Sequence, residues 1–133
     1  MIGLDTNVLV RVAVDDHPEQ AATAKELLQS LTLVEPGFVS HIVMVEIWWV
    51  LTRGYKKTPD QALSFLARLT ETATLVIQDR ELVIAALAAV RRNGADFADA
   101  LFVAVAGAQS CSSVATFDTG AIKRSGMKLA GDQ

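Results

Sequence analysis

The sequence predicts an α/β protein, a three-layer α/β/α arrangement with a central parallel sheet of four to five strands. Short apolar segments alternate along the chain with longer segments of helical periodicity. The expected order is strand, helix, strand, two helices, strand, two helices, strand, helix, strand. Parallel neighbours need crossover helices, which cover both faces of the sheet. Because the chain has 133 residues and no linker or repeat, we expect a single domain over residues 1–133.

The first half of the chain is predicted to hold two strands and three helices. Met1 to Leu4 is a strand that turns directly into a helix, and a second, amphipathic helix begins at Pro18. A second strand over residues 38–40 leads into a helix over residues 41–52. That helix is apolar nearly all round, which is typical of a buried helix.

The second half continues the alternation. A helix opens at Thr58-Pro59-Asp60 and is followed by a β-branched strand over residues 74–77. Two further helices, residues 81–92 and 97–109, precede a strand over residues 113–117. The remaining elements are a short helix over residues 119–124 and a strand over residues 127–130.

Composition places the chain among cytoplasmic proteins without a membrane segment. Its longest apolar runs are too short to cross a bilayer, its start does not resemble a signal peptide, and its one cysteine, Cys111, is expected to be a small buried hydrophobe. The net charge is −3, but four acids, Asp5, Glu46, Asp99 and Asp118, are expected in apolar surroundings, and the rest of the chain is close to neutral once they are set aside. Basic clusters at Arg53, Lys56 and Lys57 and at Arg91 and Arg92 permit RNA binding, although such short clusters are more often solvated surface charge.

Three aspartates are expected at one edge of the sheet. Asp5 and Asp118 each follow a strand, and Asp99 lies in the first turn of a helix. Ligands of such folds bind at the carboxyl ends of the strands. Helix capping is the alternative for each residue taken alone, because aspartate at a helix start contributes about 1 kcal/mol. We assign Asp96 to capping, since it stands three residues before Asp99.

Glu46 is the acid that capping does not explain. It lies inside a predicted helix, and its neighbours three and four residues away are all apolar. A buried lone carboxylate is protonated unless it is paired or bound to a metal. The alternatives are a narrow polar stripe on the helix surface or an ion pair with Arg53.

The four acids together predict a metal site. Two unit charges about 4 Å apart repel by about 4 kcal/mol at an effective dielectric constant of about 20, so a bound cation is needed to hold the cluster. A set of oxygen ligands selects Mg²⁺ or Mn²⁺. Such an ion lowers the pKa of bound water and stabilises charge on a phosphodiester, so we expect phosphodiester hydrolysis.

Four short motifs resemble the PIN-domain nucleases, most closely the VapC toxins of toxin–antitoxin pairs. They are residues 3–9, with Asp5-Thr6-Asn7, Val45-Glu46, residues 96–101, and Ala115-Thr116-Phe117-Asp118. The resemblance covers essentially the whole chain. It implies that Asp5, Glu46, Asp99 and Asp118 bind Mg²⁺, that Asn7 and Thr116 orient the site, and that Thr6 and Asp96 support it.

The same resemblance implies a wider biology. It implies cleavage of RNA by a metal-activated water, a dimeric cytosolic protein, and a small VapB-type antitoxin that blocks the site. Trp48, Trp49 and Tyr55 would suit such an interface, although core packing is the simpler interpretation of the tryptophan pair.

Three other functions remain open from the sequence. A phospho-acceptor signalling domain has a similar length and an acidic Mg²⁺ pocket, but it needs an acidic neighbour beside Asp5 and a lysine after the last strand, which this chain lacks. A PIN-like scaffold that binds RNA or protein without cutting is the second. A DNA nuclease of the same chemistry is the third, since only contacts to the 2′-hydroxyl would exclude it.

Overall fold

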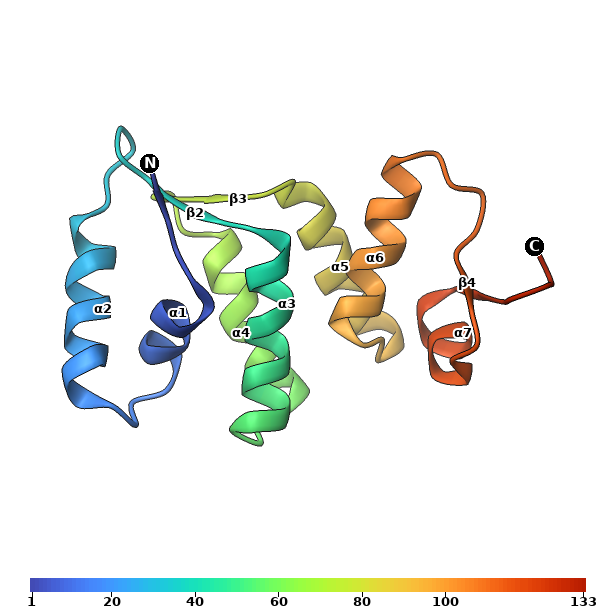
Figure 1. Ribbon diagram of the computed structural model, residues 1–133, viewed down its shortest axis with the longest axis horizontal. Helices are drawn as coiled ribbons and strands as arrows, with labels where there is room; N and C mark the ends of the chain where they lie inside the picture. Colours follow the sequence, from blue (N-terminus) through green and yellow to red (C-terminus); the bar gives the residue numbers. More distant parts are fainter. The chain divides into compact units, whose positions relative to one another are not determined.

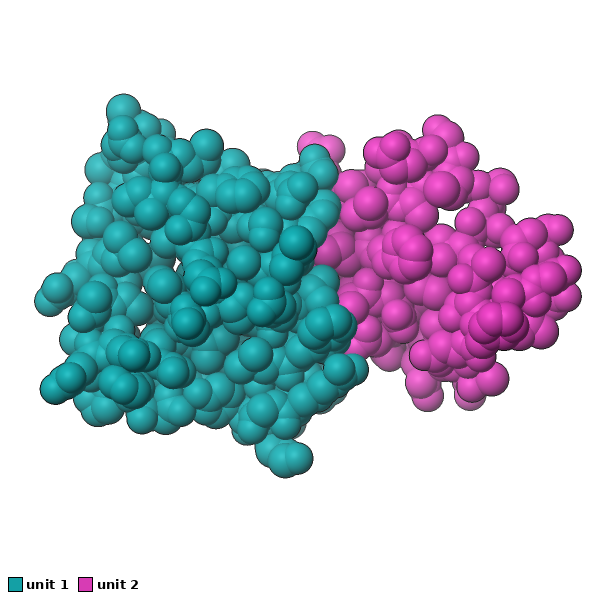
Figure 2. Space-filling model, viewed as in Figure 1, with its two compact units in different colours: residues 1–80 teal, residues 81–133 magenta.

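The computed structural model describes residues 1–133 and contains every strand and helix that the sequence predicts (Figure 1). The chain forms two compact units, residues 1–80 and residues 81–133, which Figure 2 shows in different colours. None of the helices combines the length and the apolar character that crossing a membrane requires.

Unit 1 consists of three short strands and the helices that follow them. Its elements are β1 (Ile2–Gly3), α1 (Thr6–Ala13), α2 (Pro18–Ser30), β2 (Gly37–Val39), α3 (His41–Trp49), the π-helix η1 (Val50–Gly54), α4 (Pro59–Thr70) and β3 (Leu75–Ile77). The strands form a parallel sheet in the order β1-β2-β3. Helix α1 packs against α2 and α3, and α3 packs against α4.

Local sequence accounts for the helix starts of unit 1. Proline stands at the first position of α2 and of α4, where its missing N–H costs nothing. Thr58 and Gln61 form a capping box at the start of α4, each side chain accepting a hydrogen bond from the other's backbone N–H. The hydroxyl of Ser40 accepts from the N–H of Val43 and caps α3.

Helix α3 differs from the prediction in two ways. It ends at Trp49 and continues as the π-helix η1, whereas one helix to residue 52 was predicted. It is also buried on one side only: Met44 and Ile47 are fully buried, but 71% of Ile42 and 39% of Trp49 are exposed. Apolar composition all round a helix therefore did not show which face its neighbours cover.

Unit 2 contains α5 (Arg80–Asn93), which begins at the unit boundary, α6 (Phe97–Ala108), β4 (Ala115–Thr116), α7 (Thr119–Ser125) and β5 (Lys128–Leu129). Helices α5 and α7 are each followed by a glycine with positive φ, Gly94 and Gly126, which is the usual way to end a helix. Helix α6 packs against α7, and β4 pairs with β5 in parallel.

The α/β class and the parallel strands are confirmed, but the strand pairing differs from the prediction. The five strands form a three-stranded and a two-stranded parallel sheet, where one central sheet of four to five strands was predicted. Each strand is only two or three residues long. Alternation of strands and helices predicts parallel strands, but segments this short carry no signal for which strands share hydrogen bonds.

Candidate functional site

Asp5 joins strand β1 to helix α1 and caps that helix. Its Oδ1 accepts a hydrogen bond of 2.8 Å from the backbone N–H of Thr6. The side chain is exposed, so the apolar surroundings predicted for Asp5 are wrong. No protein group donates a hydrogen bond to Oδ2, which leaves that oxygen open to a ligand or to solvent.

Thr6 carries a polar atom without a partner beside Asp5. The residue is only 8% exposed, and its hydroxyl Oγ1 is buried with no hydrogen bond in the structure. Leaving a buried hydroxyl unsatisfied costs about 1–3 kcal/mol, so such groups normally meet a water or a ligand. The start of α1 therefore offers a donor as well as a carboxylate.

Glu46 is exposed on α3, and the prediction that it is buried is wrong. It lies on the same side of the helix as the exposed Ile42 and Trp49, so an apolar neighbour in sequence did not bring burial. The predicted alternative of an ion pair with Arg53 is also not observed, because the Arg53 guanidinium lies 5.3 Å from the centre of the Trp49 ring. Glu46 thus lies on the exposed side of α3. The same helix packs against α1.

Asp96 and Asp99 belong to the first turn of α6. Asp96 caps the helix as predicted, its Oδ2 accepting from the N–H of Asp99 at 3.2 Å. Asp99 is half-buried. Burial, followed by the negative charges of Asp96 and Asp118, raises the pKa of the Asp99 carboxyl above its ordinary value. The carboxylates of unit 2 therefore lie near enough to repel one another.

Asp118 follows strand β4 and caps α7. Its Oδ1 accepts from the N–H groups of Gly120 and Ala121, at 2.8 and 3.2 Å. The hydroxyl of Thr116 accepts from the N–H of Asp118 at 3.0 Å, which fixes the turn between strand and helix. The side chain of Asp118 is exposed, against the prediction, and no protein group donates to its Oδ2.

Each unit thus carries part of the predicted acidic set. Neither unit by itself brings together three or more His, Cys, Asp or Glu side chains that could hold a metal ion. The PIN domain family matches residues 2–126, a span that contains all four acids. The chain belongs to the PIN domain family. This family is generally a nuclease fold, and a search of curated proteins finds no match to this chain.

Because the chain belongs to the PIN domain family, the alternative of a phospho-acceptor signalling domain is excluded. Asn7, predicted to orient the site, stands two residues into α1 and lines a pocket between α1 and α2. Thr116, the other residue predicted to orient the site, accepts a hydrogen bond from the backbone N–H of Asp118.

The basic residues predicted to bind RNA are all exposed. Arg53 lies in η1, Lys56 and Lys57 lie in the loop between η1 and α4, and Arg91 and Arg92 occupy the last turn of α5. Arg53 is partly engaged by the Trp49 ring. Their exposure is compatible both with RNA binding and with ordinary solvated charge.

Trp48, Trp49 and Cys111 were all expected to be buried, but only Trp48 is. Trp48 is buried as expected, whereas Trp49 is exposed on one face. Cys111 is exposed, so its prediction as a buried hydrophobe is wrong. It lies in the loop after α6, and a loop residue needs no apolar burial.

The structure also shows a polar network that sequence reasoning missed. Arg11 donates to the side chain of Gln20 at 2.7 Å and to the hydroxyl of Tyr55 at 3.3 Å, and Tyr55 donates to Asp16 at 2.7 Å. The sequence held no signal for this network, because Arg11, Gln20 and Tyr55 lie far apart along the chain and come from different segments.

Proposed function

We propose that this chain is a Mg²⁺-dependent endoribonuclease, with Mn²⁺ as a substitute. The observation that carries the proposal is the PIN match, which spans Asp5, Glu46, Asp99 and Asp118. These four residues are the proposed metal ligands.

The donor set fits a hard divalent cation. All four groups are carboxylates, which Mg²⁺ and Mn²⁺ prefer. Asp5 and Asp118 use Oδ1 for capping and keep Oδ2 free of protein donors. A cation would relieve the repulsion that Asp99 feels from Asp96 and Asp118. The unpartnered hydroxyl of Thr6 would donate to a water or a ligand oxygen at the start of α1.

The protein's own part is to hold these groups in position. Backbone N–H groups at the starts of α1 and α7 fix the Asp5 and Asp118 carboxylates, so little side-chain freedom is lost when a ligand binds. Thr116 fixes the turn before Asp118, and Asp96 fixes the turn that carries Asp99. A bound Mg²⁺ would supply the activated water and the stabilisation of charge on the attacked phosphodiester.

We further propose that the chain is the toxin of a toxin–antitoxin pair, acting in the cytoplasm as a homodimer and neutralised by a small VapB-type antitoxin. The support is the resemblance of its four motifs to VapC toxins. The exposed Ile42 and Trp49 beside Glu46 would give a partner an apolar contact next to an acid of the site.

The test is cleavage by the purified chain of labelled structured RNAs in Mg²⁺, Mn²⁺ or EDTA, with mapping of the ends produced. We expect cleavage with either metal and none in EDTA. Asp5→Asn should abolish it, whereas Asp15→Asn, the same change at another exposed position, should not.

Three results would contradict the proposal. Cleavage that persists in EDTA would exclude the metal mechanism. Binding of RNA without cleavage in either metal would favour the scaffold alternative. Equal cleavage of single-stranded DNA would favour a nuclease that does not recognise the 2′-hydroxyl.

A further inference from the structure

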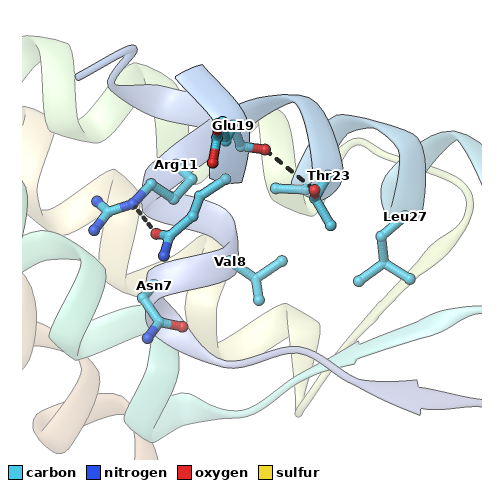
Figure 3. A pocket seen from close by; sticks show the side chains of 8 residues that line it. Asn7, Val8, Arg11, Glu19, Thr23 and Leu27 are labelled. Carbon is cyan, nitrogen blue, oxygen red and sulfur yellow. Dashed lines mark hydrogen bonds between the residues drawn. The ribbon is translucent and has the colours of Figure 1, made fainter. Parts of the chain in front are cut away.

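A pocket of about 390 Å³ opens between helices α1 and α2 of unit 1. Figure 3 shows Asn7 and Arg11 at one end of it and Leu27 at the other, with Val8 between them. Asn7 stands only two residues after Asp5, so the polar end of the pocket begins within one helical turn of a proposed metal ligand.

The polar end offers hydrogen-bonding groups that are still available. Gln20 lines the pocket and accepts from Arg11 through Oε1, which leaves its amide NH₂ as a donor. Arg11 uses Nε and Nη1 toward Gln20 and Tyr55, and its Nη2 has no protein acceptor. The amide of Asn7 makes no hydrogen bond in the structure and offers both a donor and an acceptor.

The opposite wall is apolar. It is formed by Val8, Ala24 and Leu27, of which Ala24 is buried and the others are half-buried. A flat ring that lay against this wall would present its edge to the amides of Asn7 and Gln20. Amide side chains are the groups that read the edge of a base through paired donor and acceptor contacts.

The size of the pocket favours a single base over a helical peptide. Cavities that hold small ligands run from about 300 to 1,000 Å³, and 390 Å³ lies at the lower end of that range. A peptide helix would need a groove several turns long to receive its apolar residues. The lining combines amides, a guanidinium, the Glu19 carboxylate and an apolar wall, and this mixture suits a base better than a wholly apolar helix face.

We infer that the α1–α2 pocket binds one unpaired nucleobase of the RNA strand next to the cleaved phosphodiester and contributes base preference to cleavage. This inference rests on the proposed function, because it takes RNA as the substrate. It predicts that the chain cleaves single-stranded RNA beside a preferred base. Asn7 and Gln20 read that base, and Arg11 positions Gln20 through the hydrogen bond between them.

A matched pair of variants distinguishes the effect of filling the pocket from the effect of adding bulk elsewhere on α2. Thr23 lines the pocket at an exposed position, so Thr23→Trp would fill it. Ala22 is equally exposed but does not line the pocket, so Ala22→Trp adds more bulk one residue away and serves as control. Gln20→Ala is a second test that adds no bulk, and its own control is Gln29→Ala, an exposed residue of the same helix.

The first measurement is binding without metal, from methyl NMR shifts on adding each of the four ribonucleoside 5′-monophosphates or ribose 5-phosphate. We expect shifts at Val8 and Leu27 with one nucleotide preferred over the others, and none with ribose 5-phosphate. Thr23→Trp should abolish these shifts, and Gln20→Ala should reduce the preference about tenfold, the loss of one good base contact. Ala22→Trp and Gln29→Ala should bind as wild type does.

The second measurement is cleavage of short RNAs of varied sequence in Mg²⁺ by the same proteins. Loss of base preference in Thr23→Trp but not in Ala22→Trp would support the inference. Equal NMR shifts with ribose 5-phosphate would overturn the inference. Nucleotide binding and base preference in Thr23→Trp that match those of wild type would overturn it as well. If wild type cleaves no RNA, the proposed function fails instead, whatever the nucleotides bind.

Discussion

In the proposed function, the carboxylates of Asp5 and Asp118 each serve two purposes. Capping and metal binding stand as competing explanations of these residues in the sequence, each sufficient for a lone aspartate. The structure shows that capping uses only one oxygen of each carboxylate: Oδ1 accepts from the backbone N–H groups, while Oδ2 meets no protein donor and is left for a ligand. A cap that holds the carboxylate still is therefore a means of preparing a ligand.

Asp99→Asn should raise the melting temperature of the metal-free protein at neutral pH. The folded state raises the pKa of Asp99 above 3.8, because of burial and the charges of Asp96 and Asp118, so ionisation of Asp99 opposes folding. This penalty is absent below pH 3.8 and appears as the pH rises through the folded pKa. The measurement is thermal unfolding in EDTA from pH 3 to pH 8.

The control for this prediction is Asp15→Asn, at an exposed residue whose carboxylate makes no ion pair. Its melting temperature should follow that of wild type across the pH range. A Tm difference between Asp99→Asn and wild type that is as large at pH 3 as at pH 8 would show that charge is not the cause.

Glu46→Gln and Glu46→Ala should both abolish RNA cleavage and leave the melting temperature in EDTA near that of wild type. Glu46 is exposed and pairs with no cation in unit 1, so neither change removes packing or an ion pair. Gln keeps the shape but not the charge that a hard cation needs. Activity and the rise in Tm on adding Mg²⁺ are measured together. An active Glu46→Gln enzyme that Mg²⁺ still stabilises would withdraw Glu46 and leave the three aspartates.

At the scale of the elements, the sequence predicted where helices begin better than which faces they bury. Pro18, Thr58 and the Asp96 cap mark helix starts that the structure reproduces. Burial of α3 was overestimated, because Ile42 and Trp49 are apolar and yet exposed. Caps act through contacts within a few residues, whereas the covered face of a helix depends on elements far away in the sequence.

Gly37→Ala should destabilise the protein, and Gly3→Ala should not. Gly37 begins β2, and a Cβ there would lie 2.7 Å from Leu4 Cδ1 and 2.9 Å from Leu31 Cδ1. Leu4 and Leu31 are both buried, so their side-chain ends have little room to move, and displacing them should cost about 1–3 kcal/mol. Gly3 on the paired strand β1 has open space at the same position. Chemical denaturation of both variants is the measurement, and equal midpoints would contradict the packing argument.

At the scale of the whole molecule, the class and the order of elements followed from periodicity, but the strand pairing and the set of acids as a whole did not. Periodicity reports how each segment alternates between polar and apolar residues. Pairing of strands as short as Ala115–Thr116 and Lys128–Leu129 depends on long-range hydrogen bonds that leave no trace in such segments. The α1–α2 pocket was likewise invisible, because Asn7, Arg11 and Gln20 come together only when two helices pack.

Expression of this chain alone should arrest bacterial growth if the proposed toxin role is correct, because an RNA-cleaving enzyme without its inhibitor acts on cellular RNA. The matched control is the folded Asp5→Asn chain, which loses one negative charge of the metal site while keeping its volume and a side-chain oxygen for the helix cap. Growth should continue with that variant, and co-expression of the small neighbouring gene product should restore growth with wild type. Growth rate and the amount of soluble protein are measured in the same cultures. Wild-type protein that accumulates in soluble, folded form without slowing growth would count against the toxin role, and cleavage by that same protein in vitro would leave the nuclease proposal standing.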